Sequence, residues 1–175
     1  DRRRFLANAS ADAHRLAQLI TRLLDLAQAD LTTAHPRQST DIRPILHHLV
    51  DAFTDARFRV RLDLSEKNLP IAIPAAALET VLSTLLENSR QAEARHVIIT
   101  HDSNEMTLGV TDDGNGIAPG DLSRLFDPFF TTRRDAGGTG LGLTIARSLL
   151  EAHGGTITTT KAGPGTTFTI ALPRL

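Results

Sequence analysis

Segments that alternate apolar and polar residues constrain the fold of this chain more than any other feature of its sequence. They cover residues 58–64, 96–102, 106–113, 155–163 and 165–173, and alternation at period two is typical of strands. The second and third look like paired strands, and the last two look like a closing hairpin. Because helical patterns lie between these antiparallel groups, the order predicts a two-layer α/β sandwich of the α+β class rather than a parallel βαβ sheet.

Amphipathic segments supply the helices of this sandwich. The stretch DIRPILHHLVDAFTDA predicts a helix within residues 41–56, whose inward side chains are Ile45, Leu46, Leu49, Val50 and Phe53. A longer helix is predicted within residues 74–94, opened by Pro74, and another over about residues 140–153.

The N-terminal residues show a different pattern. Residues 1–30 lack proline and glycine, and apolar positions recur in steps of three and four at Leu6, Ala9, Ala13, Leu16, Ile20, Leu23 and Ala27. Such a seam favours a partner helix from a second copy, and a helix packed onto its own domain is the alternative. Pro36 and its hydroxyl-bearing neighbours predict a linker. We therefore expect a bundle helix at 1–30, a linker at 31–41 and a second domain at 42–175.

Composition argues against several classes of protein. The 19 basic and 20 acidic side chains give a formal net charge of -1, so no overall field favours nucleic acid or an anionic membrane. The chain has no cysteine, which excludes disulfides and thiolate metal sites. No run approaches the roughly 18 apolar residues of a membrane span, and no signal peptide is visible. We expect a soluble, cytoplasmic chain with no nucleic-acid partner.

A glycine-rich stretch, GGTGLGL at residues 137–143, opens the apolar run LTIARSLLEAHGG. Amide groups at a helix N-terminus attract anions, and glycines let a phosphate chain approach the backbone closely. Glycines also cap helices and form turns without any ligand. The function of this stretch therefore depends on what the rest of the chain supplies.

Two polar residues stand at positions suited to a nucleotide. Asp112 ends an apolar strand ahead of Gly114 and Gly116, where a buried carboxylate can accept a hydrogen bond from an exocyclic amine such as that of adenine. An ordinary Asp-Gly turn is the alternative. Asn88, one helical turn past Thr84, can place an amide oxygen in a magnesium shell made otherwise of phosphate oxygens and water, and the alternative is a polar surface residue.

The segment LFDPFFTTRRDAGGTGLGL, residues 125–143, runs from an aromatic cluster through two arginines to the glycine loop. It is too polar at its end for a core and too aromatic for a plain linker. We expect a mobile cover over a ligand, anchored by Phe126, Phe129 and Phe130.

The ordered series LLENSRQA, DDGNGI, FDPFF, GTGLGL and GPGTTF resembles the N, G1, F, G2 and G3 boxes of the catalytic ATP-binding domain of sensor histidine kinases, in the GHKL superfamily. The likeness spans about residues 42–175, and five motifs in the same order argue against chance. HRLAQLITRLLDLAQAD resembles the second helix of that family's dimerisation and phosphotransfer domain. NSRQA and PFFTTRR are similar to the nitrogen-regulation type of sensor kinase.

This resemblance implies roles for individual residues. It implies that Asn88 ligates Mg²⁺, that Asp112 binds the adenine amino group and that Thr166 adds a polar contact near the adenine. The other nucleotide-binding residues that it implies are Gly114 and Gly116 at the base, and Gly138, Thr139, Gly140, Leu141 and Gly142 around the phosphates. Arg133 and Arg134 are expected partners of the outer phosphates, because a guanidinium can bridge phosphate oxygens, and exposed loop charges are the alternative.

The chain departs from the family pattern at two places. Thr84 stands where many members have a second asparagine and GHKL ATPases often have a catalytic glutamate, so fast hydrolysis of the gyrase type is not expected. The acceptor motif His-Glu-Leu-Arg-Thr-Pro is not present in this sequence. His14 lies in a second-helix context, so we expect a surface histidine there rather than a substitute acceptor.

The resemblance implies transfer of the γ-phosphate of ATP to a histidine, followed by relay to an aspartate in a response regulator receiver domain. It also implies a homodimer in the full-length protein, with a sensor domain or membrane anchor upstream. We expect this chain alone to bind ATP and Mg²⁺ without phosphorylating itself. The alternatives are a nucleotide-gated binding module or degenerate kinase, and a GHKL-type ATPase.

Overall fold

A computed structural model shows how these elements are arranged, and it describes residues 40–64, 70–133, 138–159 and 164–173. The helix predicted at residues 1–30 and nearly all of the predicted linker lie outside the described residues. The part of the chain considered below is therefore the second predicted domain.

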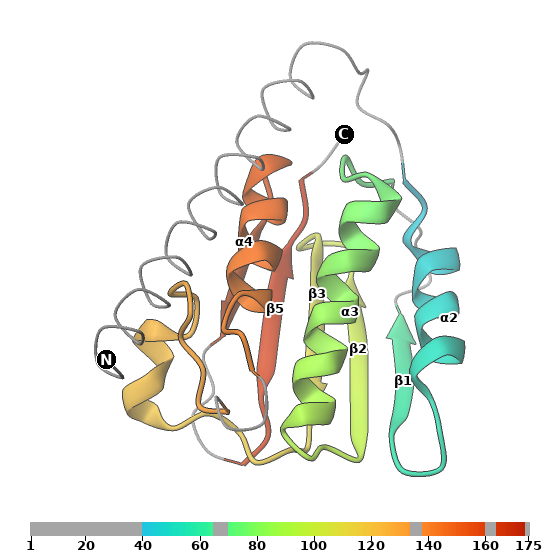
Figure 1. Ribbon diagram of the computed structural model, residues 1–175. Helices are drawn as coiled ribbons and strands as arrows, with labels where there is room; N and C mark the ends of the chain where they lie inside the picture. The colour runs from blue at the N-terminus through green and yellow to red at the C-terminus, as the bar shows by residue number, and fades with distance from the viewer. Residues whose placement is uncertain (1–39, 65–69, 134–137, 160–163, 174–175) are drawn as a thin grey trace, which may run out of the picture. The chain divides into compact units, whose positions relative to one another are not determined.

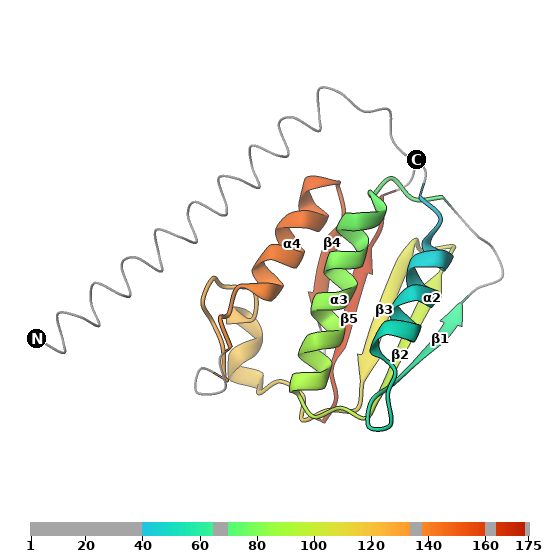
Figure 2. The same cartoon turned by 45° about the vertical axis from the view of Figure 1, so that its right-hand side comes forward.

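Three helices cover one face of a mixed sheet, as Figure 1 and the turned view in Figure 2 show. The helices are α2 (Ile42–Phe53), α3 (Ala75–Gln91) and α4 (Gly142–Ala152), with a short 3-10 helix, η1 (Pro119–Arg124), ahead of α4. The strands are β1 (Arg59–Leu64), β2 (His96–Asp102), β3 (Thr107–Asp112), β4 (Thr156–Thr159) and β5 (Thr167–Ala171). Within the described residues their order is β1-β2-β3-β5-β4, which confirms the two-layer sandwich.

Strand pairing agrees with the sequence except at one edge. β2 pairs with β3, β3 with β5 and β5 with β4, all antiparallel, so both predicted antiparallel pairs are confirmed. β1 instead runs parallel to β2, with Val60 opposite Val97. The reason is that α3 lies between β1 and β2 in the chain. This helix carries the chain back to the end of the sheet where β1 begins, so β2 can run in the same direction as β1.

Two residues ahead of α2 make contacts that hold the start of this helix. Thr40 is buried and pairs through its backbone with Ile71, and the carboxylate of Asp41 caps α2 by accepting a hydrogen bond from the amide of Arg43 at 3.0 Å. Thr40 and Asp41, at the end of the predicted linker, therefore contact the domain that follows. Side-chain capping satisfies one amide that a helix N-terminus otherwise leaves unpaired.

The core lies between the helices and the sheet. α3 occupies the middle of the helical layer, and its inward side chains are Leu78, Val81, Leu82, Leu85, Leu86 and Ser89. Facing them are alternate residues of the strands, such as Val97 and Ile99 of β2, while His96 and Ile98 point to the opposite, open face. No helix among the described residues has the length and apolar character needed to cross a membrane.

Candidate nucleotide-binding site

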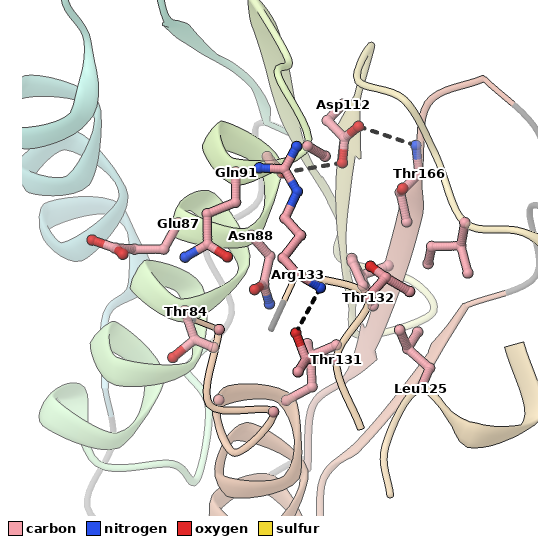
Figure 3. A pocket seen from close by; sticks show the side chains of 18 of the residues that line it. Thr84, Glu87, Asn88, Gln91, Asp112, Leu125, Thr131, Thr132, Arg133 and Thr166 are labelled. Carbon is pink, nitrogen blue, oxygen red and sulfur yellow. Dashed lines mark hydrogen bonds between the residues drawn. The ribbon is translucent and has the colours of Figure 1, made fainter. Parts of the chain in front are cut away.

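A cavity of about 1440 Å³ opens between α3, the start of α4 and the segment that joins β3 to α4. Its lining combines apolar side chains, among them Ile117, Leu125 and Phe168, with polar groups at both ends. Figure 3 shows lining side chains that come from elements far apart in the sequence, such as Asn88 of α3, Asp112 of β3 and Arg133. A mostly apolar hollow with a few convergent polar groups is the usual form of a small-molecule site.

Asp112 lies at the end of β3 and provides the fixed polar group at one end of this cavity. Its side chain is 5% exposed. Carboxylate oxygen Oδ1 accepts hydrogen bonds from the amides of Gly114 at 2.9 Å and Thr166 at 3.2 Å. Oδ2 accepts one from the hydroxyl of Ser89 at 3.1 Å. These donors hold the carboxylate in place and leave Oδ2 with acceptor capacity toward the cavity.

Ser89 is the functional residue that sequence reasoning missed. It is 1% exposed, and its hydroxyl oxygen also lies 3.1 Å from the carbonyl oxygen of Leu85. One hydroxyl proton serves one acceptor at a time, and a charged carboxylate makes the stronger bond. The available signal was a serine in the apolar stripe of α3, where every other buried residue is aliphatic.

Gly114 supports the cavity from behind its lining. Its carbonyl accepts a hydrogen bond from the amide of Gly165 at 2.7 Å, which ties the β3 turn to the loop before β5. A Cβ at this position would lie 2.7 Å from the carbonyl oxygen of Ala92. Only glycine fits this close approach of two backbones. Gly116, two residues further on, lines the cavity itself.

Thr166 contributes through its backbone as well as its position. Its amide bonds the Asp112 carboxylate, and its carbonyl accepts from the amide of Asp112 at 2.9 Å. The side chain lines the cavity beside Asp112 (Figure 3). The structure therefore brings together the two residues expected at the adenine.

Asn88 lies on α3 one turn past Thr84, and both line the cavity. The amide nitrogen of Asn88 is buried and has no hydrogen-bond partner among the described residues. An amide left unpaired at a cavity wall is suited to a bound polar group. No cluster of three or more His, Cys, Asp or Glu side chains that could hold a metal occurs in the described ranges. The amide nitrogen of Asn88 is a hydrogen-bond donor, so it suits an anionic oxygen such as that of a phosphate, and the amide oxygen of the same side chain is the atom that could ligate a Mg²⁺ ion.

Thr84 has the packing role that its residue type suggests. Its hydroxyl donates to the carbonyl of Thr80 at 2.8 Å, within α3. Its methyl carbon lies 3.2 Å from where a Cβ on Gly142 would stand. α3 and the start of α4 therefore pack closely where Thr84 faces Gly142.

The glycine loop leads directly into α4. Gly138, Thr139, Gly140 and Gly142 line the cavity, whereas Leu141 is the N-cap residue of α4 and makes no side-chain capping bond. The N-cap side chain therefore leaves the amides of the first helical turn without an acceptor, and no other described side chain accepts from the amides of Gly142 to Thr144. Such free amides, together with the helix dipole, attract anions.

Gly140 is required by the backbone at this junction. Its φ is +69°, and a Cβ there would overlap the carbonyl carbon of Phe129 and lie 2.7 Å from the carbonyl oxygen of Phe130. The carbonyl of Gly140 also accepts a hydrogen bond from the amide of Phe129 at 2.9 Å. The aromatic cluster and the glycine loop are thus in direct contact.

The aromatic cluster contacts α4 and η1 through side chains. The hydroxyl of Thr144 donates to the carbonyl of Phe126 at 3.2 Å, and the guanidinium of Arg147 lies 5.4 Å from the centre of the Phe126 ring. The guanidinium of Arg124 lies 4.7 Å from the Phe130 ring. These contacts fix the segment before Thr131, and the expected motion of the cover stays a prediction.

Arg133 lines the cavity, and its guanidinium forms an ion pair with Glu93 at 3.2 Å. Its carbonyl accepts a hydrogen bond from the amide of Gly138 at 3.0 Å. Arg134, the other predicted phosphate contact, lies outside the described residues.

The buried aspartate, the unpaired Asn88 amide and the glycine loop before α4, arranged on one sandwich, define the class of domain as an ATP-binding α/β sandwich of the GHKL type. The chain belongs to the family described as Histidine kinase-, DNA gyrase B-, and HSP90-like ATPase, whose model matches residues 74–175. The resemblance seen in the five motifs is thereby confirmed.

Curated relatives are named as sensor histidine kinases. ZraS of Escherichia coli K12 is 34% identical over 184 residues, which cover 95% of this chain and 39% of ZraS. SenX3 of Mycobacterium tuberculosis H37Rv is 32% identical over 187 residues, which cover 99% of this chain and 45% of SenX3. The chain thus spans less than half the length of these relatives.

Solved structures of histidine kinases share the fold. The catalytic domain of histidine kinase ThkA superposes with a TM-score of 0.68 at 23% identity, covering 80% of this chain and 97% of that domain. Histidine kinase AdeS of Acinetobacter baumannii gives 0.67 at 26% identity, covering 91% and 77%. The described domain is therefore a catalytic domain of the histidine kinase type.

Proposed function

We propose that this domain binds Mg-ATP in the cavity and that the full-length protein transfers the γ-phosphate to a histidine, for relay to an aspartate of a response regulator receiver domain. The observation that carries the proposal is the Asp112 carboxylate, buried at the cavity wall and held by three donors. An acceptor-only group of this kind selects a base that presents an amine, as adenine does.

The chain's own residues would orient the nucleotide from both ends. Asp112 accepts the adenine amine through Oδ2, while Ile117, Leu125 and Phe168 supply apolar surface for the base. At the opposite end the glycine loop brings the phosphates to the free amides of α4. Phosphoryl transfer depends mainly on such positioning and on neutralising charge, and Mg²⁺ supplies part of that neutralisation when bound.

Arg133 has to leave its ion pair with Glu93 before it can bind a phosphate group of the nucleotide. Its ion pair with Glu93 joins side chains that are 37% and 72% exposed, and exposed pairs of this kind contribute about 0–1 kcal/mol. A phosphate group can replace the Glu93 carboxylate at small cost, because it offers the guanidinium two oxygens. We infer the same role for Arg134.

Thr84 argues against the alternative of a GHKL-type ATPase that activates water rapidly. Its hydroxyl is bound to Thr80 within the helix, and it has no carboxylate with which to accept a proton. No feature of the described cavity specifically favours the alternative of a nucleotide-gated binding module. We therefore favour the kinase.

The wider setting follows from the same proposal. Residues 1–30 would supply part of a dimerisation bundle, residues 31–41 the connection, and residues 42–175 the catalytic domain of a sensor kinase. The full-length protein would be a homodimer. The domain would work in the cytoplasm, with any membrane anchor elsewhere in the longer protein. We also propose that this sensor kinase is of the nitrogen-regulation type, because of the motifs NSRQA and PFFTTRR.

The proposal is tested by calorimetric titration of the chain with ATP and Mg²⁺. We expect saturable binding that falls by about tenfold or more in Asp112→Asn, since a hydrogen bond to a charged group contributes about 1.5–3 kcal/mol. Asn88→Ala should reduce the gain in affinity that Mg²⁺ produces, with ATP binding in EDTA changed less. Equal affinities for the parent chain and Asp112→Asn would overturn the assignment.

A second measurement addresses phosphoryl transfer. With radiolabelled ATP the chain alone should acquire no acid-labile phosphate, because its sequence lacks the acceptor motif. A separately supplied acceptor helix carrying that motif should become labelled on histidine. Rapid steady release of phosphate from ATP by the chain alone would instead favour the ATPase.

A further inference from the structure

A second hollow lies on the other side of the α3–β2 loop and shares no lining residue with the nucleotide cavity. It encloses about 710 Å³. Its lining consists of Ala56, Arg57, Arg59, Glu93, Ala94, Arg95 and His96. Three arginines and a histidine thus face one small hollow in a chain whose formal net charge is -1.

Asp55 interacts electrostatically with Arg57, but none of the described carboxylates forms an ion pair with an arginine of this hollow. The one acidic side chain of the lining, Glu93, pairs with Arg133 of the other cavity. A hollow lined mainly by one sign of charge concentrates its field and attracts counter-ions.

Specific contacts hold the backbone of the hollow in place. In the α2–β1 turn, the carboxylate of Asp55 accepts hydrogen bonds from the amides of Arg57 at 2.7 Å and Phe58 at 2.9 Å. The amide of Arg59 donates to the carbonyl of Arg95 at 2.8 Å, which joins the start of β1 to the loop before β2. The arginines therefore project from an ordered frame.

His96 is oriented from the side of β3. Its Nδ1 lies 2.8 Å from Oδ2 of Asp113, whose Oδ1 accepts from the amides of Arg95 and His96 at 2.7 and 2.9 Å. Burial raises the pKa of Asp113, but the hydrogen bonds from His96 and Arg95 outweigh it and lower that pKa to about 2. The ionised carboxylate fixes the orientation of the ring through Nδ1, so Nε2 is the ring nitrogen that can bind another group. In the parallel pairing, His96 stands opposite Arg59.

We propose that this hollow binds a phosphate group, either free or carried on a protein side chain. Planar guanidinium groups bind the oxygens of a tetrahedral phosphate in pairs, and a dianion offsets more of the arginine charge than a single carboxylate does. The site is separate from the nucleotide cavity, so the inference does not rest on the proposed function.

The test is a titration of the chain with inorganic phosphate at constant ionic strength, followed by the ring signals of its histidines in NMR spectra. The His96 signal should shift saturably, while that of exposed His47 on α2 should not. Arg59→Gln should weaken this binding about tenfold, because it removes a charge-assisted contact. Arg61→Gln is the matched control on the same exposed face of β1 and should change it less than about twofold.

Several results would overturn the proposal. They are an unchanged His96 signal, equal weakening by Arg59→Gln and Arg61→Gln, or equally tight binding of succinate, a dianion of carboxylates. Arg57→Gln repeats the test if Arg59→Gln fails to fold. A phosphoserine peptide and its unphosphorylated form then distinguish the source of the phosphate. Tighter binding of the phosphopeptide than of inorganic phosphate indicates a protein ligand, and equal binding indicates the free anion.

Discussion

The second oxygen of the Asp112 carboxylate depends on the Ser89 hydroxyl for its orientation. We predict that Ser89→Ala weakens ATP binding by about tenfold, since it removes a hydrogen bond to a charged group worth about 1.5–3 kcal/mol. Calorimetric titration checks this prediction. ITP, which lacks the 6-amino group, should be affected much less, so the variant should also discriminate less between ATP and ITP.

Ser148→Ala, on α4 and outside the cavity lining, is the control for a serine lost from a helix. It should bind ATP like the parent chain. If Ser89→Ala reduced the affinities for ATP and ITP equally, the hydroxyl would have a general structural role and not the positioning role assigned to it.

Individual site residues differ in how well they could be predicted. Asp112, Asn88 and Thr166 could be named because each stands in a short motif, and all three line the cavity. Ser89 could not, because its partner is 23 positions away and the contact exists only when α3 packs on β3. The ion pair of Arg133 with Glu93 is likewise a product of folding, since 40 positions separate the two residues.

The junction between the aromatic cluster and α4 depends on one glycine. Gly140→Ala places a Cβ against the carbonyl groups of Phe129 and Phe130 and forces a left-handed backbone on alanine. We predict that the free energy of unfolding falls by about 1–3 kcal/mol, with loss of ATP binding as the loop is displaced. Urea denaturation and calorimetric titration measure the two effects.

Gly120→Ala, in η1, is the matched control, because a Cβ there meets nothing within 4 Å. It should change the free energy of unfolding by about 0.5 kcal/mol or less. Parent-like stability and ATP binding in Gly140→Ala would show that the loop accommodates a side chain, contrary to the contacts described.

Helices and strands were predicted more accurately than their pairing. Alternation located all five described strands, and α3 was expected over residues 74–94 and observed at Ala75–Gln91. The parallel pairing of β1 with β2 was not predicted, and neither was η1. Periodicity reports which face of an element is buried, but the direction of a neighbouring strand depends on the path of the connection.

The stability of the domain should depend on pH through two histidines. Burial lowers the pKa of His101 below 6.5, with a further lowering by Arg43 and an opposing effect of Asp102, and burial also lowers the pKa of His153. The unfolded chain therefore takes up protons as the pH falls through 6.5, before the folded chain does. Stability is present above that pH and is lost below it.

We predict a lower free energy of unfolding at pH 5.5 than at pH 7.5, with His101 contributing at most about 1.4 kcal/mol per pH unit. Urea denaturation across this range measures the slope. His101→Gln should flatten it, whereas His47→Gln, on the exposed side of α2, should not. Identical slopes in both variants would contradict the prediction.

Asp113 contributes in a separate window. Its folded pKa of about 2 lies below the ordinary value of 3.8, so its contribution is present above 3.8 and is lost as the pH falls through about 2. A loss of stability as the pH falls through about 6.5 therefore reports protonation of the histidines. A further loss of stability below about pH 4 reports protonation of carboxylates such as Asp113.

The amino-acid sequence was sufficient to predict the sandwich, its helices and strands and the order of five motifs, because these depend on local periodicity and on short spacings. The three donors around Asp112, the ordered hollow of Arg57, Arg59 and Arg95, and the parallel edge of the sheet follow only from folding. Each joins residues from segments distant in the chain, and long-range packing, which no local pattern encodes, brings them together.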